Sequence, residues 1–383
     1  MKIIEGGVTA AKGFKAAAAA AEIKYKGRTD MAMVYSEVPC VAAGTFTTNV
    51  VKAAPVKWDQ DIVYNHPSAQ VVICNSGIAN ACTGAEGYGY CKETAAAAAE
   101  VLNVAADSVL VASTGVIGMQ VPIDRIKNGV KMMAPKLDGS LEAGTEAAKA
   151  IMTTDTRKKE VAVQVEIGGK TVTIGGMCKG SGMIHPNMCT MLGFVTTDAK
   201  ISKKMLQEAL SEDVKDTYNM VSVDGDTSTN DTVLLLANGL AENPEITEKG
   251  EDYETFKAAL NYINTTLAKK IAGDGEGATG FPWWQKTNLL LFSLGLIGLI
   301  LFLFAGKKAV VLKSETTDAK NNFDSASKAK VQMNSPILWL LVLVFGFYFI
   351  GEHGVLNWLL LYCKDQFGMD SNQASIYLSM FSG

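Results

Sequence analysis

The composition of the chain changes at about Phe281, and this change limits what each side of it can fold into. Residues 1–280 are rich in alanine and glycine and moderately charged, as expected of a globular domain. After Phe281 the sequence is strongly apolar and aromatic, with long apolar runs at residues 289–305 and 337–361. We therefore expect a globular part first and two membrane-spanning helices after it.

The globular part alternates between β-rich runs that end at glycine turns and alanine-rich or amphipathic stretches. The runs predicted to form strands are residues 30–35, 41–47, 70–77, 108–118, a hairpin at 161–174, and 191–195. The stretches predicted to form helices are residues 86–102, 123–133, 142–152, 201–218 and 252–271. This mixture predicts an α/β (mixed α+β) fold in which helices and sheet form layers.

Charge and cysteine content argue against several classes of protein. The formal net charge of −4 disfavours a nucleic-acid-binding protein, whose surface is basic. The 7 cysteines include no C-x-x-C pair, which favours reduced thiols in the cytoplasm over disulfides or a zinc site. The loop that begins at Asp224 resembles a calcium loop, but Thr229 and Leu235 stand where glycine and glutamate are needed. Neither the cysteines nor this loop therefore predicts a metal site. No signal peptide is found at the start of the sequence, so we expect the enzyme domain to be cytoplasmic.

Thr190 occupies a position that suits a nucleophile. It follows a turn at residues 185–187 and precedes the apolar run 191–195, so a constrained turn and a buried strand would hold it. We expect the glycines at 175, 176, 180 and 182 to form a bend before this turn. If the peptide bond before Thr190 is cut, the new α-amine, with a pKa of about 7.7–8, can accept the hydroxyl proton. The plain alternative is a buried strand threonine whose hydroxyl bonds a carbonyl group.

Three short strings around Thr190 carry a resemblance to a known family. They are Lys-Gly-Ser-Gly-Met-Ile from Lys179, Pro-Asn-Met from Pro186 and Thr-Met-Leu from Thr190. This segment closely resembles the self-cleaving segment of the ornithine acetyltransferase (glutamate N-acetyltransferase) family of arginine biosynthesis. The resemblance implies an Ntn-like domain that cuts itself between Cys189 and Thr190, with the threonine as the N-terminal nucleophile. Cys189 replaces the alanine usual in the family, and a thiol nucleophile at this position is an alternative.

The family's oxyanion hole matches the string Ser-Thr-Gly-Val-Ile-Gly that begins at Ser113. Acyl transfer passes through a tetrahedral anion, which needs hydrogen-bond donors held in place beforehand. The resemblance implies that Thr114 and Gly115 supply these donors. By spacing alone, the string would be an ordinary turn between a strand and a helix.

Four residues match positions where the family contacts its substrate. The resemblance implies contacts from Thr153 in a Met-Thr-Thr-Asp string, with Thr154 beside it, and from the nucleophile Thr190 itself. It implies a further contact from Lys179, whose charge suits a substrate carboxylate, and one from Glu276 in a glycine-rich string. The plain alternatives are a helix end rich in hydroxyls for the threonines and a simple turn for the glutamate.

The resemblance implies that an acetyl group moves from N-acetylornithine to glutamate through an acetyl-threonine intermediate, in a ping-pong reaction without a cofactor. It leaves open whether acetyl-CoA is also an acetyl donor. The α fragment, residues 1–189, and the truncated β fragment, residues 190–281, would form a heterotetramer as in the intact family. An Ntn-type amidohydrolase, with water as the acceptor, is the alternative enzyme.

The family resemblance ends near Thr279, although the family's own sequence continues further. Residues 282–383 instead resemble the centre of a sugar-permease-like major facilitator transporter, with Glu352 and His353 inside the second apolar run. The lysine-rich loop between the two runs predicts a cytosolic position, which would place the enzyme domain outside the cell. This conflict suggests that two unrelated reading frames are joined near residues 279–282. We expect weak or no activity from the truncated enzyme, and a fragment of a membrane transporter is the alternative function.

Overall fold

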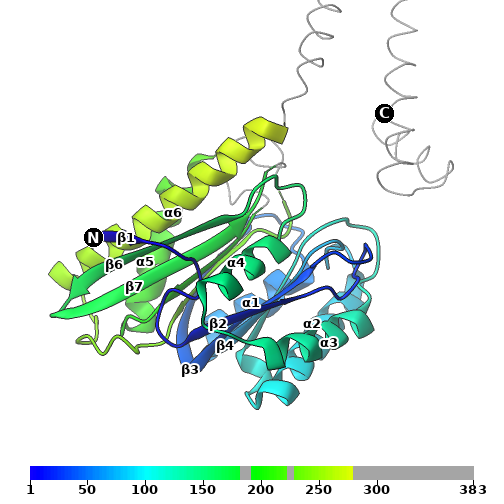
Figure 1. Cartoon of the computed structure of the whole chain (residues 1–383), viewed down its shortest axis with the longest axis horizontal. Helices are drawn as coiled ribbons and strands as arrows, with labels where there is room; N and C mark the ends of the chain where they lie inside the picture. The colour runs from blue at the N-terminus through cyan, green and yellow to red at the C-terminus, as the bar shows by residue number, and fades with distance from the viewer. Residues whose placement is uncertain (182–190, 222–227, 279–383) are drawn as a thin grey trace, which may run out of the picture. The chain divides into compact units, whose positions relative to one another are not determined.

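The computed structural model describes residues 1–181, 191–221 and 228–278 of the chain, with the backbone alone at 275–278 (Figure 1). The chain separates into two units after Gly280, and the described residues belong to the first unit. In this described part, no helix is long and apolar enough to cross a membrane.

Several predictions concern residues outside the described part. Both predicted membrane spans, at residues 289–305 and 337–361, belong to this group. So do the predicted cleavage site between Cys189 and Thr190 and the first residues, 224–227, of the loop that begins at Asp224. For these positions the structure supplies only the placement of their described neighbours.

A nine-stranded sheet runs through the described residues (Figure 1). The strands follow the order β1-β6-β7-β8-β9-β3-β4-β5, and β2 pairs with β3 beside this path. The β8–β9 and β4–β5 pairs are parallel and the other pairs are antiparallel. The bounds are β1 (Lys2–Ile4), β2 (Phe14–Ala19), β3 (Met31–Phe46), β4 (Ala69–Asn75), β5 (Val109–Ser113), β6 (Lys159–Ile167), β7 (Lys170–Lys179), β8 (Leu192–Thr197) and β9 (Thr232–Ala237).

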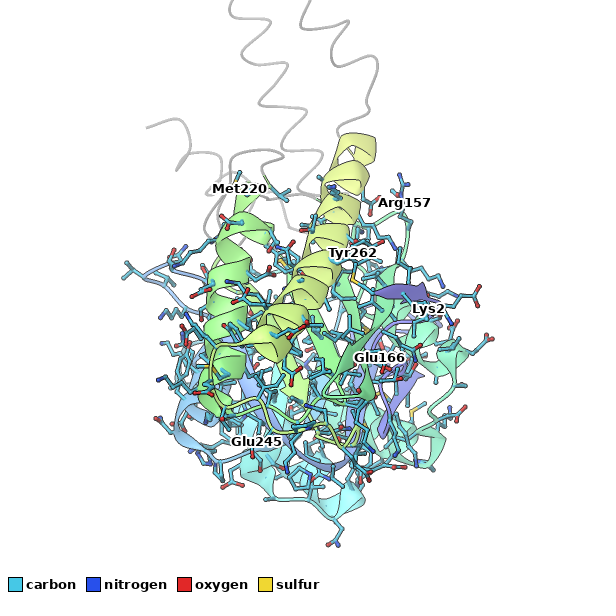
Figure 2. All side chains as sticks on the ribbon, turned by 90° about the vertical axis from the view of Figure 1, so that its left-hand side faces the viewer. Lys2, Arg157, Glu166, Met220, Glu245 and Tyr262 are labelled. Atoms are coloured by element: carbon cyan, nitrogen blue, oxygen red, sulfur yellow. The ribbon has the colours of Figure 1, made fainter. Side chains whose placement is uncertain are left out.

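Helices cover both faces of this sheet, which is why its central strands are apolar without alternation. In β9, Val233 and Leu235 pack into the core cluster beneath α5 and α6, while Leu234 and Leu236 pack into the cluster on the other face. Figure 2 shows α5 and α6 side by side over their face. The bounds are α1 (Ala54–Asn65), α2 (Gly84–Leu102), α3 (Ile123–Met133), α4 (Leu141–Ala150), α5 (Lys203–Asp216) and α6 (Glu251–Ala278). The predicted layered, mixed α/β architecture is therefore confirmed for the described part.

The strands predicted at residues 30–35 and 41–47 are one long strand, β3. Its first half pairs with β2 and β4, and its second half pairs with β9. The register shifts between Tyr35 and Cys40, where polar residues and Pro39 suggested a turn in the sequence. The irregularity bends the strand without ending it, so β3 joins the two halves of the sheet.

The predicted bend at Gly175 and Gly176 is wrong, because both glycines lie inside β7. A Cβ at Gly175 would lie 2.0 Å from the carbonyl oxygen of Gly7, so the glycine permits close approach of a neighbouring segment. Residues 273–278, expected to form a turn after the last helix, belong to α6. Glycine costs a helix about 1 kcal/mol relative to alanine, and the buried side chain of Asp274 anchors this last part of α6.

Candidate active site

The first residues of β8 lie where several predicted site residues meet. Lys179, the last residue of β7, pairs with Leu192, the first residue of β8. Thr232, the first residue of β9, pairs with Leu192 from the other side. Thr190 is outside the described residues, but the chain joins it to Met191, which is buried at this end of the sheet. Lys179 therefore lies on the strand next to the one that the predicted nucleophile enters.

The predicted oxyanion corner follows β5 and packs against the turn that follows β4. The N–H of Thr114 donates to the carbonyl of Asn75 at 2.9 Å, and the N–H of Val116 donates to that of Gly77 at 3.1 Å. Gly115 has a φ of +133°. A Cβ at this residue would lie 2.3 Å from the carbonyl carbon of Gly77, so the corner requires glycine.

Two hydrogen-bond donors at this corner have no acceptor among the described residues. In the described ranges, neither the N–H of Gly115 nor the hydroxyl of Thr114 donates to another residue. Donors fixed on a rigid turn can stabilise negative charge as it develops in a transition state. The geometry leaves both groups available for the role that the sequence predicts.

Two consecutive residues connect the oxyanion corner with the start of β8. The side-chain amide of Asn230 donates to the carbonyl of Ser113, immediately before the corner. The carboxyl group of Asp231 accepts a hydrogen bond from the N–H of Met191 at 3.2 Å. One short stretch of chain therefore holds both the residue before the predicted anion site and the residue after the predicted nucleophile.

Replacing Gly115 by alanine is expected to lower the free energy of unfolding by about 2–5 kcal/mol, because the Cβ adds a backbone collision to an unfavourable φ. Gly118→Ala is the matched control. Gly118 also has a positive φ, +85°, but nothing lies within 4 Å of its Cβ position. We expect it to cost about 1–2 kcal/mol. Denaturant unfolding measures both, and equal losses would contradict the packing of this corner against the β4 turn.

Lys179 is a buried cation, with 4% of its surface exposed. Burial lowers the pKa of its ammonium group below the ordinary value, Asp155 opposes this shift, and the nearby charge of Lys159 adds to it. Asp231 also faces Lys179 and opposes the lowering of its pKa. A buried lysine with weakened solvation interacts strongly with an anion that enters beside it.

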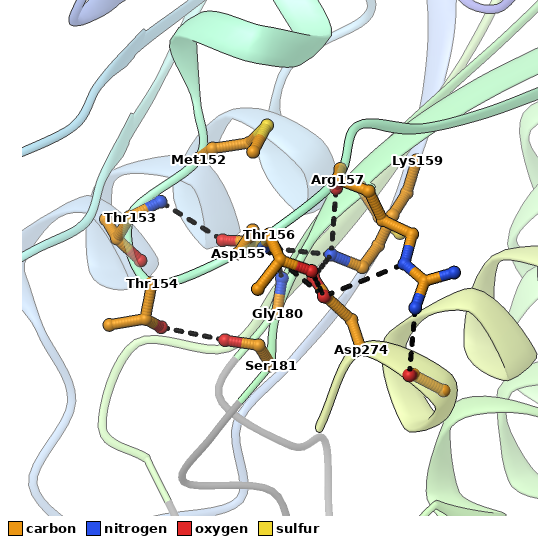
Figure 3. Close-up of polar contacts among 12 residues, drawn as sticks. Met152, Thr153, Thr154, Asp155, Thr156, Arg157, Lys159, Gly180, Ser181 and Asp274 are labelled. Atoms are coloured by element: carbon orange, nitrogen blue, oxygen red, sulfur yellow. Dashed lines mark hydrogen bonds and ion pairs between the residues drawn. The ribbon is translucent and has the colours of Figure 1, made fainter. Parts of the chain in front are cut away.

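A buried ion network that includes Asp155, the carboxyl group beside Lys179, connects three segments of the chain (Figure 3). The Nζ of Lys159 lies 2.6 Å from Asp155 Oδ1 and 2.5 Å from Asp274 Oδ2, and all three side chains have 0% exposure. Asp155 also accepts from the N–H of Gly180 at 2.7 Å. Asp274 accepts from both the N–H and the hydroxyl of Thr156. The network fixes the loop after α4, the end of β7 and the end of α6 relative to one another.

The pKa values of the two carboxyl groups in the network depend on nearby lysines and hydrogen bonds. Burial alone would raise the pKa of Asp155, but Lys179 and Lys159 outweigh burial and hold that pKa below its ordinary value. Burial also acts against ionised Asp274, and its hydrogen bonds to Lys159 and Thr156 again lower the net pKa. Both carboxyl groups are therefore ionised near neutral pH, and the network depends on the charge of Lys159.

The predicted substrate contacts surround this network. The N–H of Thr153 donates to Asp155 Oδ2 at 3.0 Å, and the Thr154 hydroxyl bonds that of Ser181 at 2.8 Å (Figure 3). Glu276 is on α6, two residues after Asp274, and its side chain lies outside the described part. The structure thus brings the backbone positions of Thr153, Lys179 and Glu276 to one region of the fold.

Sequence reasoning missed Asp231, Asn230, Lys159 and the role of Asp155. Asn230 and Asp231 belong to the loop that begins at Asp224, which resembles a string of the family and was expected to shape the active site, but neither residue was given a role. Lys159 was visible only as one of several adjacent basic residues. Within the described ranges, no group of three or more histidine, cysteine, aspartate or glutamate residues could hold a metal ion.

The ArgJ family model matches residues 15–283 of this chain. The chain belongs to the ArgJ family. It is 54% identical over 281 residues to the arginine biosynthesis bifunctional protein ArgJ of Symbiobacterium thermophilum, covering 73% of this chain and 69% of that protein. The Lactococcus lactis protein of the same name is 51% identical over 281 residues, with the same coverage of 73% and 69%. The solved ornithine acetyltransferase complexed with ornithine from Mycobacterium tuberculosis is 43% identical, covering 48% of this chain and 97% of that chain, with a TM-score of 0.44.

Family membership confirms the predicted enzyme class, an ornithine acetyltransferase of arginine biosynthesis in the ArgJ family. The chain spans 69% of the length of each of these two bifunctional relatives. The family match gives no support to the transporter-like fragment predicted for residues 282–383. The roles of individual residues in the ArgJ site stay predictions.

Proposed function

We propose that this ArgJ chain cuts itself before Thr190 and then transfers an acetyl group from N-acetylornithine to glutamate through an acetyl-threonine intermediate. In this scheme the freed α-amine of Thr190 takes the proton of its own hydroxyl, which attacks the acetyl carbonyl. Thr114 and Gly115 stabilise the anion that forms on the carbonyl oxygen. Ornithine leaves, and the amine of glutamate then attacks the acetyl-threonine ester.

The observation that carries this proposal is the shared anchoring of the corner and the start of β8. Asn230 bonds the carbonyl before Thr114, and Asp231 bonds the N–H of the residue after Thr190. Among the described residues, the N–H of Gly115 and the hydroxyl of Thr114 donate to no other group, which supports their proposed role in holding the anion. Family membership shows the reaction class, and this anchoring supports the proposal that the corner and Thr190 act together.

Substrate recognition in the proposal depends on one buried cation. N-acetylornithine and glutamate both carry an α-carboxylate, and Lys179 on the neighbouring strand would pair with it. Thr153 and Glu276, placed around the same ion network, would orient the rest of the substrate. Desolvation strengthens the pairing of Lys179 with an anion, and this would favour amino acid derivatives over neutral amides.

Lys179→Met is expected to weaken binding of N-acetylornithine about 10- to 100-fold, because a charge-assisted hydrogen bond contributes about 1.5–3 kcal/mol. In the unchanged protein the affinity should fall as pH rises toward the lowered pKa of Lys179, since only the cation pairs with the carboxylate. Lys179→Met should remove this pH dependence. Titration calorimetry at several pH values measures both effects.

Lys203→Met is the control for that experiment. Burial lowers the pKa of Lys203 too, but its Nζ bonds the carbonyl of His66, at 2.6 Å, away from β7. This variant should bind like the unchanged protein. Equal affinity and equal pH dependence in Lys179→Met would show that Lys179 does not contact the carboxylate.

A direct test of the reaction mixes N-acetylornithine with glutamate and follows N-acetylglutamate. Release of acetate in place of transfer would indicate the amidohydrolase alternative. Acetyl-CoA offered with glutamate tests the second acetyl donor. Assembly of residues 1–189 and 190–281 into a heterotetramer, the cytoplasmic location of the enzyme, and the transporter-like nature of residues 282–383 belong to the same proposal and need separate measurements.

A further inference from the structure

The proposed function leaves the first cut without a base. The α-amine of Thr190 can accept a proton only after the bond to Cys189 is broken. Before that, its nitrogen belongs to an amide, whose lone pair is delocalised into the carbonyl group and is not basic. Some other group must take the hydroxyl proton in the uncut chain. The identity of this group matters only if Thr190 has its proposed role as the nucleophile.

Asp231 has a geometry that suits this task. It is 1% exposed and lies immediately before β9, which is the strand parallel to β8. Its Oδ1 accepts the N–H of Met191 at 3.2 Å, which is the amide that Thr190 forms with the next residue. The carboxyl group therefore bonds the peptide group that joins Thr190 to Met191.

The second oxygen of this carboxyl group is unused. Asp231 Oδ2 is buried and has no hydrogen-bond partner within residues 1–181, 191–221 and 228–278. Buried polar atoms are rarely left without a partner, and such atoms point to a ligand, a water or a catalytic task. A buried carboxyl group with one oxygen fixed and one oxygen open can accept a proton from a neighbouring hydroxyl.

Charges around Asp231 suit a group that changes protonation near neutral pH. Burial raises the pKa of Asp231 to about 8, against the hydrogen bond from Met191, the nearby Ser228 side chain and the charge of Lys179. Lys179 on β7 is the charged group that faces it, and Asp155, Lys159 and Cys74 in turn surround Lys179. A base with a pKa near the working pH both accepts and returns a proton readily.

We propose that Asp231 is the base of the self-cleavage reaction, before the α-amine of Thr190 exists. Its carboxylate takes the hydroxyl proton of Thr190 while Oγ attacks the carbonyl carbon of Cys189. The tetrahedral intermediate collapses by breaking the carbon–nitrogen bond, and Asp231 returns the proton to the leaving nitrogen. An ester now joins Cys189 to Thr190 Oγ. Water hydrolyses this ester, giving the carboxyl group of Cys189, the free hydroxyl and the α-amine.

Asp59 gives a matched control. Asp59 is also buried, and its Oδ1 accepts a hydrogen bond from the backbone N–H of Val111 at 2.8 Å. Its Oδ2 has no hydrogen-bond partner among the described residues. Burial raises its pKa as well. It differs from Asp231 in position, since it anchors α1 to the middle of β5. Asp59→Asn therefore makes the same chemical change away from the β8 start.

The test follows cleavage of newly made chain from cell-free translation by intact mass, between pH 6 and 9.5. In the unchanged protein the rate should rise with pH and level off above about 8, because the base must be ionised. Asp231→Asn should slow cleavage about 100-fold or more and remove this dependence, the usual effect of losing a general base. Asp59→Asn should cut at the unchanged rate if it folds, as circular dichroism will show.

Three results are decisive. Cleavage of folded Asp231→Asn at the unchanged rate would overturn the inference. If Asp231→Asn does not fold, the profile of the unchanged protein decides, and a rate that is flat across this pH range overturns the inference. Absence of any cleavage in the unchanged protein would instead sink the proposed role of Thr190, so the two failures are distinguishable.

Discussion

Thr190→Ala is expected to leave the protein as one uncut chain of 40.7 kDa. The variant lacks the hydroxyl that attacks the preceding carbonyl, so neither cleavage nor an acetyl-enzyme can form. Acetyl transfer should fall by roughly 10³-fold or more, as when other enzymes lose a nucleophile. Intact-mass analysis measures cleavage, and formation of N-acetylglutamate measures transfer.

Two neighbouring variants make this experiment specific. Cys189→Ala restores the residue that the family usually carries, so it should cut normally. Failure to cut in Cys189→Ala would favour the alternative thiol nucleophile. Thr190→Ser keeps a hydroxyl and should retain partial cleavage. A Thr190→Ala protein that still splits into two fragments would contradict the assigned nucleophile.

Lys159→Met is expected to lower the free energy of unfolding by about 3–5 kcal/mol, the usual cost of removing one partner from a buried ion pair. The variant would remove the buried cation that bonds both Asp155 and Asp274, whose side chains have 0% exposure. Lys179 still faces Asp155, and Arg157 still lies 3.8 Å from Asp274, but neither one bonds both carboxyl groups. Denaturant unfolding at pH 7 measures the loss. Lys159→Met should also weaken substrate binding, because the network positions Thr153 and the end of β7.

The loss should depend on pH in a defined direction. In the unchanged protein Lys179 and Lys159 keep the pKa of Asp155 low, and Lys159 and Thr156 keep that of Asp274 low, so the stability these carboxylates contribute is lost as pH falls. Without Lys159 both pKa values should rise from these lowered values, so protonation at lower pH relieves the repulsion. The difference between the two proteins should therefore be smaller at pH 5 than at pH 7.

Lys257→Met is the control for this prediction. Lys257 lies 2.5 Å from Glu212, but the two side chains are 33% and 37% exposed. Exposed pairs contribute about 0–1 kcal/mol, so this variant should be nearly as stable as the unchanged protein. A similar loss in both variants would contradict the importance of the buried network.

Much of the local structure could be predicted because it depends on short-range pattern. The hairpin about Gly168 and Gly169, the helix after Pro122 and the strand before Gly77 were all predicted near their observed bounds. In each case apolar spacing and turn residues act within a few positions. The same reasoning found Thr190, since a turn followed by a buried strand is a local pattern.

Long-range packing overrode local preference elsewhere. Alanine favours helix, yet residues 16–19 form part of β2, because β3 pairs with them and α4 covers them. Glycines within residues 273–277 favour a turn, yet α6 continues through them, because Asp274 is bound by Lys159 and Thr156. These outcomes depend on partners that the local sequence does not contain.

The sequence by itself determined the family, the layered α/β class and the residue types needed for acyl transfer. Only the tertiary structure decided which polar groups support them, because burial and hydrogen bonding arise between distant segments. Asp231 meets Met191 across 40 residues, and Asp274 meets Thr156 across 118 residues. The charge and pKa of a buried side chain depend on such neighbours, and no window of sequence around it contains them.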